Sequence, residues 1–142
     1  MIQPLPHSVV CDTDVFSFLF NRDPVRGPRY ARYLEGPNVF LPFSVVGELL
    51  FGAEDAGWGP VRRHQLERTI RRYQIEYPNY VVCEIWAEIR VAAQQVGRRI
   101  EREDAWVAAT ALYLDLPLVT HNARHYSVVG GLRILTEPDQ AP

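Results

Sequence analysis

The chain has 142 residues, of which 47% are hydrophobic and 23% are charged, values close to those of ordinary globular proteins. This length corresponds to about one domain and is enough to bury a hydrophobic core, so we expect a single domain over residues 1–142. The net charge of −2 excludes a generally basic nucleic-acid-binding protein. All 15 basic residues are Arg, which argues against mechanisms that need a catalytic or phosphate-binding lysine.

The apolar runs of the sequence are a few residues long, whereas a membrane-spanning helix needs about 20. Residues Met1–His7 have neither a basic start nor a long apolar stretch, so we predict no signal peptide and expect a soluble cytoplasmic protein. The two cysteines lack the spacing of a disulfide scaffold or a zinc site. Cys11 and Cys83 each end a Val-Val-Cys run and are predicted to be buried strand residues.

Short β-branched or apolar runs alternate with helical patterns along the chain. The predicted strands are Ser8–Cys11, Asn38–Leu41, Tyr80–Cys83, Pro117–Thr120 and Arg133–Leu135. The predicted helices are 14–20, 29–34, 45–56 with Ser44 as N-cap, 60–73, 84–96 and 103–114. This alternation predicts an α/β fold with three layers, in which helices cover both faces of a mostly parallel sheet of about five strands. Binding sites in such sheets lie beyond the carboxyl ends of the strands.

Several polar side chains are predicted to face that edge of the sheet. Asp12 directly follows the first strand, where an unpaired charge is costly, and Asn122 follows the fourth. Glu48 lies in an almost wholly apolar helical segment, and Asp104 opens a helix whose small residues favour close packing on the sheet. Each residue also has an ordinary alternative role, as a helix cap, a partly exposed side chain or a turn residue. Together they predict one cleft lined by oxygen ligands.

Such a cleft has a specific chemistry. Three carboxylates and an amide with no lysine nearby would repel one another, and oxygen ligands of this kind suit Mg²⁺ or Mn²⁺. A bound cation reverses the local charge, so an acidic pocket becomes able to hold a phosphate. The cation also lowers the pKa of a bound water. The sequence therefore predicts metal-assisted hydrolysis of a phosphodiester.

Four segments follow one another in a distinctive order between Val9 and Leu135. They are Asp-Thr-Asp at 12–14, a helix containing Glu48, the stretch from Gly97 through Asp-Ala-Trp-Val-Ala-Ala-Thr-Ala at 104–111, and Leu-Val-Thr-His-Asn-Ala-Arg-His-Tyr at 118–126. In this pattern the chain resembles the PIN-domain ribonucleases and, among them, the VapC toxins of bacterial and archaeal toxin–antitoxin pairs.

This resemblance implies a homodimer, Mg²⁺- or Mn²⁺-dependent cleavage of RNA that arrests growth, and inhibition by a partner antitoxin. Carried over by position, Asp12, Glu48 and Asp104 are the metal-binding acidic residues. Asn122 takes a fourth catalytic position that is often Asp in PIN domains, and its neutral side chain puts a second metal in doubt. The Thr120 hydroxyl would orient the site. His-Tyr at 125–126 stands where Asp-Phe is more usual, so no catalytic role is assigned there.

Two other functions stay open. Asp12-Thr13-Asp14 after an apolar strand also resembles the start of a haloacid-dehalogenase-type phosphatase, with Asp12 as nucleophile and Asp14 as acid–base. That family normally uses a lysine, which this chain lacks. A non-catalytic PIN-like module that only binds protein or RNA is favoured by Asn122, whereas the retention of the acidic residues argues against it.

Two surface features also have alternative interpretations. Arg62, Arg63, Arg71 and Arg72 could follow an RNA backbone or form a solvated face paired with Glu67 and Glu76. A set of aromatic residues could form a groove for an antitoxin helix or belong to the core or a dimer contact. These are Phe16, Phe18, Phe20, Tyr30, Tyr33 and Phe51.

Overall fold

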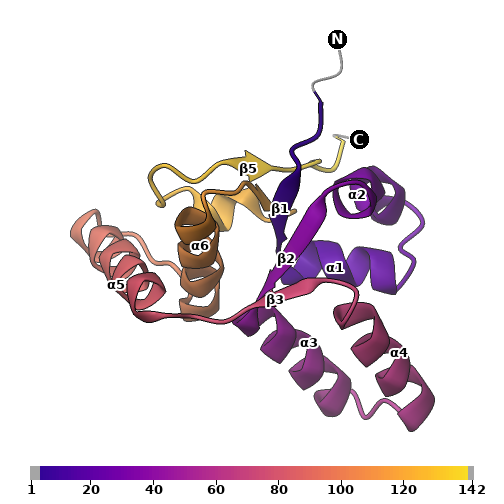
Figure 1. Cartoon of the computed structure of the whole chain (residues 1–142). Helices are drawn as coiled ribbons and strands as arrows, with labels where there is room; N and C mark the ends of the chain where they lie inside the picture. The colour runs from indigo at the N-terminus through magenta and orange to yellow at the C-terminus, as the bar shows by residue number, and fades with distance from the viewer. Residues whose placement is uncertain (1–3, 141–142) are drawn as a thin grey trace.

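A five-stranded parallel sheet organises the computed structural model, which describes residues 4–140 (Figure 1). The strands are β1 (Ser8–Cys11), β2 (Asn38–Pro42), β3 (Gln74–Glu76), β4 (Leu118–Val119) and β5 (Ile134–Leu135). Their order in the sheet is β3-β2-β1-β4-β5, and every neighbouring pair is parallel. The predicted α/β fold is thus confirmed. Residues 1–3 and 141–142 lie outside the described part, so a domain extending over 1–142 and the absence of a signal peptide at 1–7 stay predictions.

Helices cover both faces of this sheet, as predicted. They are α1 (Thr13–Phe20), α2 (Arg26–Glu35), α3 (Phe43–Asp55), α4 (Pro60–Ile70), α5 (Tyr80–Gln95) and α6 (Arg102–Leu114). In Figure 1, α5 and α6 lie on one side of β1 and β2, and α1 and α2 lie on the other. Helices α3 and α4 extend away from the sheet, with α4 leading back into β3. Within residues 4–140, no helix combines the length and apolar character needed to cross a bilayer.

The central strand β1 is buried on both faces. Val9, Val10 and Cys11 are fully buried, as expected for a strand covered by helices on either side. Helix α6 presents fully buried Ala105 and Ala108 to the core. Their small side chains allow close packing, which brings the start of α6 near the carboxyl end of β1.

The prediction of a strand at Tyr80–Cys83 is wrong, because this segment forms the first turn of α5. Asn79 caps that helix, since its Oδ1 accepts a hydrogen bond from Val82 N at 3.0 Å. The cap stabilises a helical start despite the β-branched run that follows it. The third strand of the molecule is instead Gln74–Glu76, which pairs with β2. Helix α4 accordingly ends at Ile70, three residues before the predicted end at Tyr73.

The structure also corrects the predictions for two single residues, Cys83 and Ser44. Cys11 is buried in β1 as predicted, but Cys83 is exposed because it lies on the outer face of α5. Ser44 is not an N-cap, since α3 begins at Phe43, two residues before the predicted start at 45, with Pro42 in the capping position. The Ser44 hydroxyl is buried and has no hydrogen-bond partner within residues 4–140.

Candidate active site

Asp12, Glu48, Asp104 and Asn122 line one cleft of about 930 Å³ beyond the carboxyl end of β1. Asp12 follows β1, Glu48 lies in the middle of α3 and Asp104 is in the first turn of α6. Asn122 precedes a short 3₁₀ helix, Ala123–Tyr126, that follows β4. Side chains that are up to 110 residues apart in sequence therefore meet because parallel strands deliver their carboxyl ends to one edge.

Asp12 is the most tightly held of these residues. Its carboxylate is 7% exposed, and its Oδ1 accepts from Thr13 N at 2.8 Å as the N-cap of α1. Its Oδ2 accepts from Thr120 Oγ1 at 2.8 Å and from the hydroxyl of Tyr126 at 2.7 Å. Asp12 therefore both caps α1 and lines the cleft. Three donors orient this carboxylate, and Thr120 is one of them, as the resemblance implies.

Tyr126 is the residue that sequence reasoning missed. It is 1% exposed, and its hydroxyl lies 2.7 Å from Asp12 Oδ2 and 3.3 Å from Asp104 Oδ1. Burial, together with the nearby Asp12 and Asp104 carboxylates, raises the pKa of this hydroxyl far above its ordinary value. It therefore stays protonated and donates its hydrogen between two acids. The available signal was the hydroxyl itself, at a position where Phe is more usual.

The remaining carboxylates of the cleft lack neutralising partners of comparable strength. Burial raises the pKa of Glu48, and the negative charges of Asp12 and Asp104 raise it further. Burial likewise raises the pKa of Asp104, with Asp12 adding to the effect. His125 Nδ1 lies 3.4 Å from Asp104 Oδ2 and opposes this shift. The cleft thus holds negative charges at a cost in free energy.

Asp14 has a different role from its neighbour. Its Oδ1 accepts from Val15 N at 2.7 Å and its Oδ2 from His121 N at 3.0 Å. These bonds tie the start of α1 to the loop that carries Asn122. Burial and the Asp12 charge nevertheless raise the pKa of Asp14 from 3.8 to about 6.

The donor set of the cleft fits a hard divalent cation. Carboxylate and amide oxygens are the ligands that Mg²⁺ and Mn²⁺ prefer, and the raised pKa values of Glu48 and Asp104 reflect charges that a cation would stabilise. The buried Ser44 hydroxyl, which also lines the cleft, is without a partner in the described range. Within residues 4–140, no three His, Cys, Asp or Glu side chains already stand close enough to share a metal ion.

The arginines of α4 do not line this cleft. Arg62 stacks on Trp58, with its guanidinium carbon 3.6 Å from the ring centre, and donates to Asn21 Oδ1 at 3.0 Å. Arg63 pairs with Glu54 at 2.6 Å. The predicted pairing with Glu67 and Glu76 is therefore wrong, because in residues 4–140 neither glutamate forms an ion pair with these arginines.

The aromatic residues proposed for a groove divide into three sets. Phe18 and Phe20 are partly buried and pack against the core. Phe16, Tyr30 and Tyr33 are buried in the core, so the groove interpretation is wrong for them. Phe51 is 68% exposed and lines the cleft.

Comparisons with known proteins identify the family of this chain. The family model described as PIN domain matches residues 9–131. The chain belongs to the PIN domain family. This PIN domain is homologous to the VapC1 ribonuclease toxins, and it is 26% identical to Ribonuclease VapC1 of Haemophilus influenzae strain R2866 over 123 residues, or 86% of this chain and 92% of the relative.

Solved structures share the fold of this PIN domain. VapBC2 from Rickettsia felis, bound to a DNA fragment from its promoter, superposes with a TM-score of 0.79 at 17% identity, covering 91% of this chain and 98% of the other. VapBC-1 from nontypeable Haemophilus influenzae superposes with a TM-score of 0.75 at 24% identity, covering 91% and 97%. These likenesses establish a PIN-like fold.

Proposed function

We propose that this PIN domain is a Mg²⁺- or Mn²⁺-dependent endoribonuclease and the toxin component of a toxin–antitoxin pair. The observation that carries the proposal is the convergence of Asp12, Glu48 and Asp104 on one cleft at the carboxyl edge of the sheet. The homology to VapC1 ribonucleases supports the choice of RNA as substrate.

In this function Asp12, Glu48 and Asp104 would hold the cation, which when bound activates a water and stabilises charge on the reacting phosphate. The backbone of Thr13 and the hydroxyls of Thr120 and Tyr126 keep the Asp12 carboxylate in a fixed orientation. Asn122 adds a neutral amide to the cleft, so it contributes no further charge that would repel the substrate. Hydrolysis forms a bond between the water oxygen and phosphorus and breaks the bond to a ribose oxygen, which leaves with a proton.

The test is cleavage of total RNA with Mg²⁺ or Mn²⁺, with the new ends mapped. We expect discrete cuts that disappear with a chelator and in Asp12→Asn. The matched control is Asp55→Asn, which makes the same chemical change at an exposed position at the end of α3, outside the cleft. Folded wild-type protein that cuts nothing under either metal would contradict the proposal.

Two alternatives make different predictions in the same assay. A binding module, for which the neutral Asn122 is the one favourable feature, would retain RNA without cutting it. A haloacid-dehalogenase-type phosphatase would hydrolyse phosphate monoesters, but the PIN domain match and the absence of Lys both speak against it. A screen of monoester substrates separates these outcomes.

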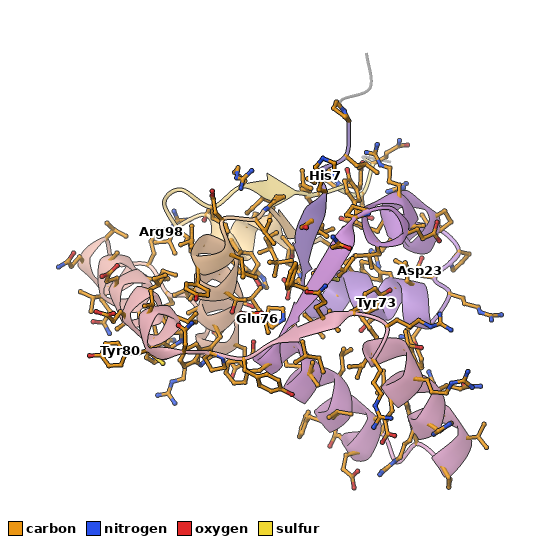
Figure 2. The ribbon with its side chains drawn as sticks, viewed as in Figure 1. His7, Asp23, Tyr73, Glu76, Tyr80 and Arg98 are labelled. Atoms are coloured by element: carbon orange, nitrogen blue, oxygen red, sulfur yellow. The ribbon has the colours of Figure 1, made fainter. Side chains whose placement is uncertain are left out.

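The proposal includes two protein partners. The structural neighbours VapBC2 and VapBC-1 are toxin–antitoxin complexes, which supports an antitoxin partner for this chain. A homodimer is consistent with apolar side chains left exposed on α5, among them Tyr80 and Val81. Figure 2 shows Tyr80 pointing outward from the start of that helix. Expression without the antitoxin is expected to stop growth, and light scattering is expected to give twice the chain mass.

A further inference from the structure

A group of arginines lies beside the acidic cleft, on α5, on the connection to α6, at the start of α6 and in the 3₁₀ helix. These residues line two further hollows, of about 440 and 280 Å³. We call them the arginine group; they are Arg90, Arg98, Arg99, Arg102 and Arg124.

The two hollows continue the surface of the cleft. The smaller one shares Glu101, Asp104 and His125 with the cleft. It shares Arg98 and Arg99 with the larger one. The cleft and both hollows therefore adjoin one another on the surface, so a chain molecule that occupies the cleft can extend directly into arginine-lined space.

The arginine group is only partly engaged within the protein. Gly97, with φ of 68°, turns the chain at the end of α5 and sends Arg98 and Arg99 toward the start of α6. Arg98 donates to Ser127 Oγ at 2.7 Å, and Figure 2 shows it beyond the end of α5 that lies away from Tyr80. In the described part of the chain, the side chains of Arg99 and Arg124 make neither a hydrogen bond nor an ion pair. Their donors remain available to a ligand.

We propose that Arg98, Arg99 and Arg124 bind backbone phosphates of the RNA strand next to the phosphate that reacts in the cleft. This inference rests on the proposed ribonuclease function and extends it to the path of the substrate. The lining of the acidic cleft includes no arginine that could bind the phosphates of an RNA. Arginine forms bidentate, charge-assisted hydrogen bonds to phosphate, so the adjoining hollow supplies what the cleft lacks. An acidic peptide could bind these arginines without reaching the cleft, whereas an RNA substrate must occupy the cleft and the adjoining hollow together.

The test compares two pairs of arginines whose side chains form neither hydrogen bonds nor ion pairs within residues 4–140. Arg99→Gln with Arg124→Gln removes two charges from the small hollow. Arg71→Gln with Arg72→Gln removes two exposed charges at the end of α4, which lines neither the cleft nor the hollows. Binding of a fluorescent single-stranded RNA is measured across a salt series with chelator present, so that no cutting occurs. Circular dichroism verifies that both variants are folded.

We expect the first variant to bind more weakly and to reduce the slope of log affinity against log salt by about 1.4, because each phosphate contact on a single strand contributes about 0.7. In cleavage with Mg²⁺ its KM should rise about tenfold or more while kcat is retained. The Arg71 and Arg72 variant should match wild type in both assays.

Unchanged slope and KM in the first variant would overturn the proposal, and a loss confined to the Arg71 and Arg72 variant would move the RNA path to α4. Either result leaves the ribonuclease function intact, because the wild-type protein still cuts RNA. Wild-type protein that neither binds nor cuts RNA would refute both together.

Discussion

Acidic side chains occur in two contrasting environments in this molecule. In the cleft, burial and mutual repulsion raise the pKa values of Glu48 and Asp104. In the C-terminal strap, residues 136–139, the acids are neutralised. Glu137 Oε1 accepts from Tyr33 and Arg32, both at 2.6 Å, and Asp139 accepts two hydrogen bonds from Arg26. These partners lower the pKa of Glu137 and bring that of Asp139 down to about 2.

The contrast shows that the fold pairs the strap carboxylates with arginine and leaves Glu48 and Asp104 in the cleft without such a partner. The strap acids stabilise a contact between the end of the chain and α2. The buried and mutually repelling charges of Glu48 and Asp104 lower the stability of the protein, which is the usual trade between stability and activity at a functional site. His121 joins the two regions, since its backbone N–H donates to Asp14 and its Nδ1 lies 2.8 Å from the Tyr30 hydroxyl.

The largest expected effect follows from neutralising a cleft acid. Asp104→Asn should lower metal-dependent cleavage by at least about a hundredfold, because losing even a residue that orients a metal ligand costs about 10- to 100-fold. Its free energy of unfolding in chelator should not fall, since a charge repelled by Asp12 is removed. Initial rates and urea unfolding measure the two effects. Retained cleavage, or destabilisation by more than about 1 kcal/mol, would contradict this account of the cleft.

The pH dependence of stability should differ between the two regions. Asp14 has a pKa of about 6 in the folded protein against 3.8 ordinarily, so its contribution to stability is complete below 3.8 and is lost as the pH rises through 6. A shift of this size corresponds to about 3 kcal/mol. In chelator, the protein should therefore gain stability when the pH falls from 7 to 5. The strap contributes a pH dependence of the opposite sign. Asp139 stabilises the fold when it is charged, and it loses this contribution only as the pH falls from 3.8 through about 2.

Thermal unfolding between pH 5 and 7 tests this difference. Asp14→Asn should flatten the pH slope, whereas Asp139→Asn should leave it unchanged, because Asp139 does not titrate in that range. If the Asp14→Asn variant keeps the wild-type dependence of stability on pH, that dependence comes from other titrating groups.

Tyr126→Phe should have a smaller effect, a loss of about 2 kcal/mol in chelator. The variant removes the donor that bridges Asp12 and Asp104 and leaves the size of the ring unchanged. Saturating Mg²⁺ should reduce the loss, since a cation would take over the role of the shared hydrogen. Unfolding measured with and without Mg²⁺ gives both values, and Tyr113→Phe, at an exposed position on α6, is the control. An equal loss under both conditions would make Tyr126 a packing residue alone.

The sequence predicted best those helices and strands whose local structure is determined by their own residues. β1 and α6 were predicted nearly to the residue, because a mostly apolar strand and a stripe of small residues are each compatible with few local structures. β3 was missed since it has three residues, of which two are polar, and its pairing with β2 is a tertiary property. Tyr80–Cys83 was misassigned because β-branched residues favour a strand, whereas the Asn79 cap decided the local structure.

The candidate site shows the same division. Asp12, Glu48, Asp104 and Asn122 could be brought together from the rule that polar residues at strand ends share an edge. The Tyr126 bridge and the strap depend on contacts between residues more than 20 positions apart whose orientation no local pattern reveals. The arginine group was missed for the same reason, since Arg99 and Arg124 meet only through the fold.

The smallest expected effect comes from the strap. Glu137→Gln should lower the free energy of unfolding by about 1 kcal/mol or less, because its ion pair with Arg32 is partly exposed and such pairs contribute little. Cleavage should be unchanged, since Glu137 lies outside the cleft. Glu67→Gln, on the exposed face of α4, controls for the loss of one negative charge. If Glu137→Gln instead reduced cleavage as strongly as Asp104→Asn, the strap would be part of the active site through His121, and the division of the acids into a stabilising and a functional set would fail.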